Sequence, residues 1–123
     1  MCGAVAYGLT APTSPDADRW ETVWHYMQGG PGIFKGDMYF YKVDGDIRAR
    51  IDRIQADKVP IHLLTGDYDF SCTPQATREL AERLGPSVSA QIMSDMGHFP
   101  MSENPARFLQ YLRPVLESIK TAA

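Results

Sequence analysis

The chain has 123 residues, of which 44% are hydrophobic and 22% charged, and its formal net charge is −3. This length corresponds to one domain, and the composition is globular, which excludes collagen, a long coiled coil and a disordered segment. The net negative charge provides no positive field for a phosphate backbone, so we expect no nucleic-acid partner. The longest apolar runs have about six residues, against the roughly 18 needed to cross a bilayer, so we expect no membrane partner.

The two cysteines of the chain, Cys2 and Cys72, are too few for a disulfide framework. They also lack a Cys-x-x-Cys or Cys/His spacing typical of zinc sites. Residues 1–9 are apolar but lack the positive charge that begins a secretory signal. We therefore expect a cytoplasmic protein with reduced thiols, no structural metal and no cofactor.

The first half of the chain is predicted to contain one short strand followed by helical segments. Residues 1–8 are apolar on both faces and end at a glycine, which predicts a buried strand. Pro15 suits the first position of a helix, which stops at the Gly-Gly-Pro-Gly run of residues 29–32. An aromatic-rich segment follows at 34–41, and isoleucines on one stripe predict a helix at 46–55.

The second half alternates strands and helices. The run 59–65 is apolar and bounded by proline and glycine, which predicts a buried parallel strand, and residues 88–93 predict a second one. A Thr-Pro pair at 73–74 predicts the start of a helix between these strands, and an Asn-Pro pair at 104–105 opens a final helix. Strands and helices in this order indicate parallel strands joined by crossover helices, and therefore an α/β fold.

Two loops that follow predicted strands carry residues suited to acid–base chemistry. Asp67 and Asp69 follow the first of these strands, and His98 follows the second. Open α/β sheets bind ligands at the carboxyl ends of their strands, so we expect an acid and the histidine to meet there. A carboxylate that accepts the Nδ1 hydrogen of an imidazole fixes its tautomer and stabilises the imidazolium that forms when Nε2 takes a proton. The pattern therefore predicts a charge-stabilised general base.

These two loops and the helix between them resemble the C-terminal portion of the α/β-hydrolase family. The motifs that carry the resemblance are Gly66-x-x-Asp69 after a Val-Pro-apolar strand, and the run Gly-His-Phe-Pro-Met-Ser-Glu-Asn-Pro at residues 97–105. The resemblance implies that Asp69 is the acid of a catalytic triad and that His98 is its base. Asp67 is the competing acid, but the family's Gly-x-x-Asp spacing favours Asp69.

The resemblance also implies a partial α/β-hydrolase fold of about three parallel strands with flanking helices and a helical cap segment. Residues 1–8 would be a core strand, 9–56 the cap or lid, and 57–123 the C-terminal core segment. We expect aromatic side chains of the cap, together with Phe99 beside the histidine, to bind an apolar or aromatic acyl-type substrate. The alternative is that the cap aromatics form the core of the lid. These candidate substrate-binding residues are Trp20, Trp24, Phe34, Tyr39, Phe40, Tyr41 and Phe99.

The sequence contains no Gly-x-Ser-x-Gly nucleophile elbow, which the family places before the strand predicted at 1–8. We therefore expect either a hydrolase segment for ester or related acyl bonds whose nucleophile lies elsewhere, or a catalytically inactive fragment or small-molecule binding module with an aromatic pocket. An unrelated small α/β domain is a third interpretation, and it requires Asp69 and His98 to lie apart. The exposed sheet edge expected at 1–8 favours a homodimer through edge pairing.

Three further titratable side chains have structural interpretations. His62 is predicted to be a core histidine of a strand, and His25 to lie at the surface or at the rim of the pocket. Glu103, beside the start of the final helix, is interpreted as a capping residue rather than as a second acid.

Overall fold

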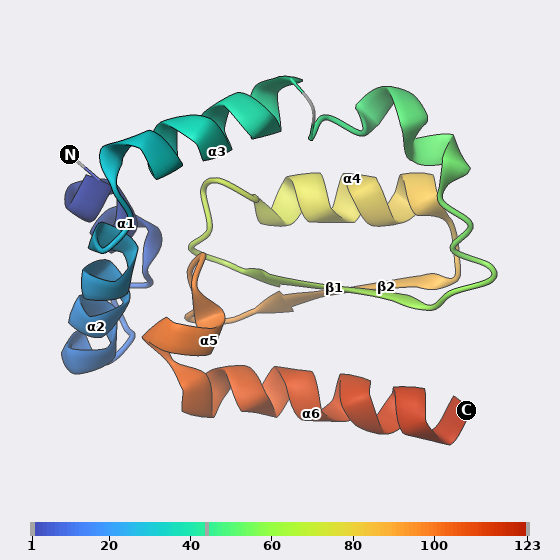
Figure 1. Ribbon diagram of the computed structural model, residues 1–123. Helices are drawn as coiled ribbons and strands as arrows, with labels where there is room; N and C mark the ends of the chain where they lie inside the picture. The colour runs from blue at the N-terminus through green and yellow to red at the C-terminus, as the bar shows by residue number, and fades with distance from the viewer. Residues whose placement is uncertain (1, 44, 123) are drawn as a thin grey trace.

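A two-stranded parallel sheet lies between helices that cover its two faces, and further helices lie beyond the end at which both strands finish (Figure 1). The computed structural model describes residues 2–43 and 45–122. In chain order its elements are α1 (Cys2–Leu9), α2 (Asp16–Met27), α3 (Pro31–Val43), the 3-10 helix η1 (Arg48–Arg53), β1 (Ile61–Gly66), α4 (Pro74–Leu84), β2 (Val88–Met93), α5 (Pro100–Glu103) and α6 (Pro105–Ala122).

The sheet consists of β1 and β2, which pair in parallel from Ile61 opposite Val88 to Gly66 opposite Met93. The crossover helix α4 covers one face of the two strands, and α6 covers the other (Figure 1). This arrangement confirms the two strands and the helices predicted for the second half of the chain. Because the strands run in the same direction and end level with each other, the loops that follow them start at the same edge.

Local signals explain where α4 begins, where it ends and how it is anchored. The hydroxyl of Thr73 accepts a hydrogen bond of 3.2 Å from the backbone N–H of Ala76 and so caps the first turn. Gly85 ends the helix with a φ of 99°, a conformation that a residue without Cβ adopts easily. The hydroxyls of Thr65 on β1 and Thr77 on α4 share a buried hydrogen bond of 2.7 Å.

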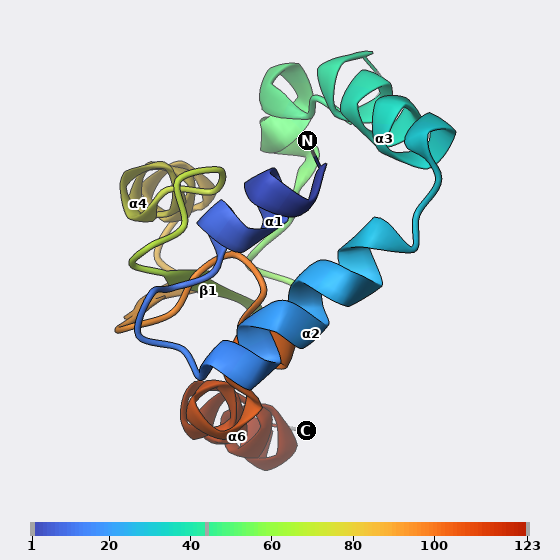
Figure 2. The ribbon, with the colours of Figure 1, turned by 90° about the vertical axis from the view of Figure 1, so that its left-hand side faces the viewer.

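The strand predicted at 1–8 is wrong for the described part of that range, because residues 2–9 form helix α1. Met1 lies outside the described residues. Across residues 2–43 and 45–122 the sheet therefore has two strands instead of about three. A short apolar run fits a buried helix as well as a buried strand, and a helix satisfies its own backbone hydrogen bonds without a neighbouring strand. Here the run packs against α2 (Figure 2).

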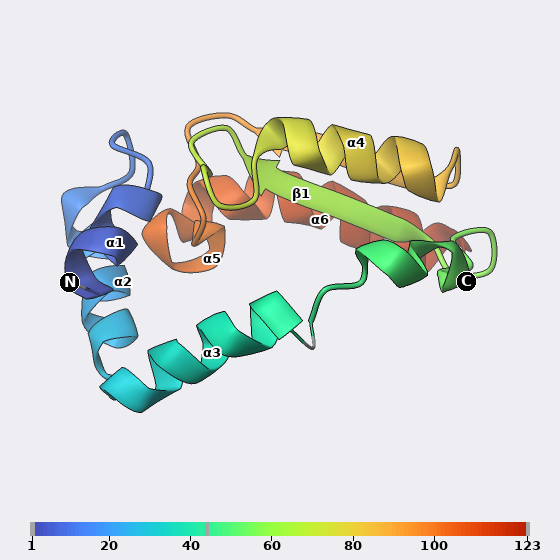
Figure 3. The same cartoon turned by 90° about the horizontal axis from the view of Figure 1, so that it is seen from above.

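The remaining N-terminal elements are helical. The helix predicted after Pro15 is α2, and the aromatic-rich segment belongs to α3, for which no element was predicted. The helix predicted at 46–55 is the shorter η1, whose Ile51 is buried. Seen from above, α3 leads from α2 back toward η1 and the start of β1 (Figure 3).

The most deeply buried side chains lie where the sheet meets α1 and α2. Met93 at the end of β2 and Met96 in the following loop are fully buried, and Leu9 and Val23 are nearly so. The buried core is therefore centred at the carboxyl ends of the strands and next to the loops that carry the candidate acid and histidine. No helix in the described part of the chain combines the length and the apolar character needed to cross a membrane.

We predict that Gly66→Ala destabilises the fold. A Cβ at this position would collide with the backbone carbonyls of Met96 and Gly97, which cannot move away like the end of a flexible side chain. The free energy of unfolding should fall by about 1–3 kcal/mol in urea titration. Gly36→Ala is the matched control, because a Cβ there meets open space on α3 and alanine favours a helix. Equal losses in the two variants would contradict the prediction.

Candidate active site

The loops that follow β1 and β2 are hydrogen-bonded to each other. The backbone N–H of Asp67 donates to the carbonyl of Met93 at 3.0 Å, and that of Tyr68 donates to the carbonyl of Met96, also at 3.0 Å. The Asp67 carboxylate accepts a hydrogen bond of 3.2 Å from the backbone N–H of Met96. These contacts hold both loops at one edge of the sheet.

The structure brings Asp69 and His98 together at this edge. The Oδ2 atom of Asp69 lies 2.8 Å from Nδ1 of His98. Its Oδ1 atom accepts hydrogen bonds of 2.8 Å from the backbone N–H groups of Ser71 and Cys72. The Asp69 side chain is 6% exposed. The unrelated-domain interpretation required the acid and the histidine to lie apart, and they do not.

The geometry leaves the second ring nitrogen of His98 available. When Nδ1 donates its hydrogen to Asp69, Nε2 carries a lone pair and can take a proton. The His98 ring is 31% exposed and packs edge-on against Phe99 with 4.9 Å between the ring centroids. The competing acid Asp67 is exposed and bonds to the backbone of the neighbouring loop instead. Among the two aspartates considered, Asp69 therefore orients the imidazole.

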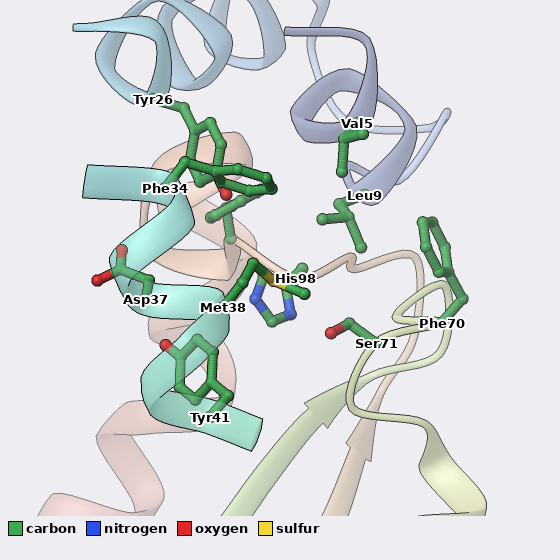
Figure 4. A pocket seen from close by; sticks show the side chains of 11 residues that line it. Val5, Leu9, Tyr26, Phe34, Asp37, Met38, Tyr41, Phe70, Ser71 and His98 are labelled. Atoms are coloured by element: carbon green, nitrogen blue, oxygen red, sulfur yellow. The ribbon is translucent and has the colours of Figure 1, made fainter. Parts of the chain in front are cut away.

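A cavity of about 410 Å³ opens beside His98 (Figure 4). Its walls come from α1, α2, α3 and the two loops, and they are mainly apolar. The lining residues are Val5, Leu9, Tyr26, Phe34, Asp37, Met38, Tyr41, Phe70, Ser71, His98 and Phe99. The cavity therefore places apolar surface next to a histidine that is paired with a carboxylate.

The predicted substrate-binding side chains divide into two groups. Phe34, Tyr41 and Phe99 line the cavity, whereas Trp20, Trp24, Tyr39 and Phe40 do not. Trp20 packs against Tyr7 with 4.9 Å between the ring centroids. Trp24 and Tyr39 are each 65% exposed. Phe40 packs against Tyr41 from outside the cavity lining, with 5.9 Å between their rings.

Several lining residues were not predicted, and helical periodicity is the signal that could have found some of them. Four lining residues lie on one face of α3, because they are spaced at intervals of three, one and three residues along the helix. They are Phe34, Asp37, Met38 and Tyr41. Phe70 directly follows the acid in its loop. Recognising that residues 31–43 form a helix would have separated the lining side chains from their outward-facing neighbours.

The other two histidines lie away from the acid–histidine pair. On β1, Nδ1 of His62 lies 2.7 Å from the hydroxyl of Ser89 on β2, and the His62 residue is half-buried. On α2, His25 is exposed and lines a smaller hollow of about 190 Å³. Both can therefore serve as comparison positions for His98.

One group of potential metal ligands occurs among the described residues, and it overlaps the acid–histidine pair. Ligand atoms of Asp69, Cys72 and His98 all lie within 4.8 Å of one another. However, Asp69 already accepts three hydrogen bonds. Burial, and then the Asp69 charge, raise the pKa of the Cys72 thiol, whereas a metal-bound cysteine must lose its proton. In the arrangement that the structure shows, Asp69 is therefore already engaged by hydrogen bonds.

Comparison with known proteins identifies a similar bacterial protein. The chain is 33% identical over 89 residues to the AB hydrolase superfamily protein YclE of Bacillus subtilis (strain 168). The match covers 70% of this chain and 32% of the bacterial protein, so the chain spans about a third of that relative's length. No family model matches the chain, and no solved structure matches it.

We predict that Asp69→Asn accelerates alkylation of Cys72. The raised pKa of this thiol means that less thiolate is present at a given pH than in a cysteine with the ordinary pKa. Replacing the carboxylate by an amide removes the charge that disfavours the thiolate, so the pKa should fall and the reaction with iodoacetamide at pH 8 should become severalfold faster. Asp67→Asn is the control, with Cys2→Ser in every variant to remove the second thiol. Equal alkylation rates for all variants would contradict the prediction.

Proposed function

This chain is a partial α/β-hydrolase-like segment, and from that premise we propose that it supplies the acid and the general base of a nucleophile–histidine–acid triad. The reaction is hydrolysis of an ester or a related acyl bond. The observation that carries the proposal is the 2.8 Å contact between Asp69 and His98 at the wall of a mainly apolar cavity. The contact joins an acid and a base, and the cavity offers space for an acyl group.

In the proposed reaction His98 moves one proton in two steps. Its Nε2 atom takes the proton of the nucleophile as the nucleophile attacks the carbonyl carbon of the substrate. The resulting imidazolium then gives this proton to the leaving alcohol when the bond between the carbonyl carbon and the leaving oxygen breaks, which leaves the acyl group on the nucleophile. A water molecule removes the acyl group in the same two steps: Nε2 takes a proton of the water as it attacks the carbonyl carbon, and the imidazolium returns a proton to the nucleophile as the carboxylic acid leaves. Asp69 remains ionised throughout, keeps the ring oriented and stabilises its positive charge.

The proposal places the nucleophile outside these 123 residues. The sequence has no Gly-x-Ser-x-Gly motif. Ser71 lies in the loop between β1 and α4, and Ser102 lies on the short helix α5. Neither serine follows a strand directly in the strand–turn–helix elbow that exposes a nucleophile.

We further propose that residues 9–56, which contain α2, α3 and η1, act as the cap and that the substrate has an apolar or aromatic acyl portion. The side chains of Leu9, Phe34 and Met38 give this part of the cavity its apolar character. We also propose that the chain works in the cytoplasm with reduced thiols. We also propose that the chain forms a homodimer through edge pairing. Because residues 2–9 form helix α1, the pairing edge would belong to the β1–β2 sheet and not to the strand expected at residues 1–8.

A second candidate function is binding of a small apolar molecule without turnover. The observation in its favour is that the lining side chains from α1, α2 and α3 form an apolar cavity irrespective of any nucleophile. Apolar pockets with a few polar groups are typical of small-molecule sites. On this alternative His98 would provide a hydrogen bond to the bound molecule.

The triad proposal is tested by a chimera in which this chain replaces the matched segment of the bacterial relative. We expect the chimera to hydrolyse p-nitrophenyl butyrate, and His98→Ala to lower kcat/KM roughly 10,000-fold because the general base is lost. His25→Ala is the matched control and should retain the activity. Turnover by a folded chimera that is insensitive to His98→Ala would contradict the proposal. Thermal stabilisation by the ester without turnover would favour the binding function.

The same chimera tests which aromatic side chains contact the substrate. Phe34→Ala removes apolar surface from the cavity lining, so we expect KM for p-nitrophenyl butyrate to rise about fivefold with little change in kcat. Trp24→Ala is the control, because this large side chain is exposed and lies outside the cavity. Similar KM values for the two variants would show that Phe34 does not contact this substrate.

A further inference from the structure

The carboxylate of Glu103 is fully buried on α5 and accepts four hydrogen bonds from uncharged donors. Its Oε1 atom accepts from the backbone N–H groups of Gly97 at 2.7 Å and Phe99 at 3.2 Å. Its Oε2 atom accepts from the backbone N–H of Ala11 at 2.5 Å and from the hydroxyl of Ser14 at 3.3 Å. Burying a carboxylate is costly unless such bonds replace its hydration, so this network specifies one arrangement of the donors.

The donors to Oε1 lie on either side of His98 in the sequence. The N–H of His98 itself donates to the carbonyl of Leu9 at 2.8 Å. Three successive backbone amides, those of residues 97–99, are therefore held, the outer two by Glu103 and the middle one by Leu9. The same carboxylate also holds Ala11, two residues beyond Leu9, so one side chain joins both segments.

The junction of these two segments has no room for adjustment. A Cβ built on Gly97 would lie 2.7 Å from the backbone nitrogen of Ala11 and 2.8 Å from Oε1 of Glu103, and it would also collide with the carbonyl of Leu9. Distances below 3.0 Å do not occur for real Cβ atoms, so the segment 9–11 and the His98 loop are already in direct contact. Leu9 also lines the cavity beside His98.

We propose that Glu103 is a positioning residue for His98, and this inference rests on the proposed function of His98 as a general base. By holding the backbone on both sides of His98, the carboxylate places the imidazole so that Nδ1 meets Asp69. By holding Ala11, it also sets the separation between the apolar wall at Leu9 and the Nε2 atom. Glu103 therefore links the position of the base to the position of the substrate-binding wall.

The two simpler roles considered for Glu103 do not account for its contacts. The capping role was expected at the start of the final helix α6, but there Asn104 accepts a hydrogen bond of 3.1 Å from the backbone N–H of Arg107, and the bonds of Glu103 go to other segments. A second acid would need an oxygen directed at the reacting groups, whereas both oxygens of Glu103 are occupied by the donors named above. The bonds to two separate segments are what the positioning role requires.

The test is Glu103→Gln in the full chain, with the imidazole signals of a ¹⁵N-labelled sample as the readout. A glutamine has the same shape as a glutamate, but its NH₂ group is a donor and cannot accept a hydrogen bond. Whichever oxygen of Glu103 it replaces, it would face the donors of that segment, so the hydrogen bonds to one of the two segments are lost. We expect a folded protein in which the Nδ1–H resonance of His98 shifts or broadens. The signal of His62, which pairs with Ser89, should stay unchanged and provides the internal control.

Glu79→Gln is the matched control variant, because Glu79 is an exposed glutamate on α4 whose side chain bonds to Gln75. It should leave the His98 signal as it is. In the chimera, Glu103→Gln should lower kcat roughly 10- to 100-fold while KM changes less, since a displaced base mainly affects the chemical step. A folded Glu103→Gln protein with an unchanged His98 signal would overturn the proposal.

Glu103→Asp keeps the inference testable if Glu103→Gln does not fold. This change keeps the negative charge but shortens the side chain by one methylene, so the carboxylate cannot reach the backbone donors of both segments. We expect a shift of the His98 signal, and an unchanged signal in a folded Glu103→Asp protein would overturn the proposal. The readout does not depend on turnover. A His98 shift without hydrolysis by the chimera would therefore support the positioning role and count against the proposed function.

Discussion

The parallel pairing of β1 and β2, with both strands ending at the same level, is the constraint on which the site depends. Gly66 lies opposite Met93, so the two following loops begin side by side. Because Gly66 has no side chain, the loop after β2 can lie directly against the end of β1. This close contact brings together Asp69 and His98, which are 29 residues apart in the sequence, and their bond involves only the Nδ1 atom of the imidazole.

The elements that could be predicted are those with local signals. The apolar runs at 59–65 and 88–93 lie within two residues of β1 and β2 at each end, and the Thr-Pro pair at 73–74 marks the start of α4. The run at 1–8 was assigned to the wrong element because its apolar residues show no period that separates a strand from a helix. Helix α3 was missed because its Pro-Gly start is typical of a turn, although proline is equally suited to the first position of a helix.

The candidate site also contains residues that could be predicted from the sequence and residues that could not. Asp69 and His98 could be predicted because motifs at strand ends are short and contiguous in the sequence. The family's Gly-x-x-Asp spacing favoured Asp69 over the competing Asp67, and the loop geometry agrees, because Asp69 faces the imidazole and Asp67 bonds to the backbone of the neighbouring loop. The network of Glu103 could not be predicted, because its donors from the N-terminal segment lie 92 and 89 residues away and neither belongs to a recognisable pattern. A buried carboxylate satisfied by backbone amides carries no sequence signature of its own.

The contact between the N-terminal segment and the loop around His98 also affects the order of folding. The bond between Asp69 and His98 closes a stretch of 29 residues, whereas the bond between Ala11 and Glu103 closes one of 92. Longer closures cost more conformational entropy, and non-local contacts form more slowly than local ones. The strands and α4 can therefore assemble while α1 is still undocked. During synthesis the residues around Leu9 emerge from the ribosome before the two strands but obtain their partner only when Glu103 has emerged, so a partly made chain contains β1 before its pocket can be completed.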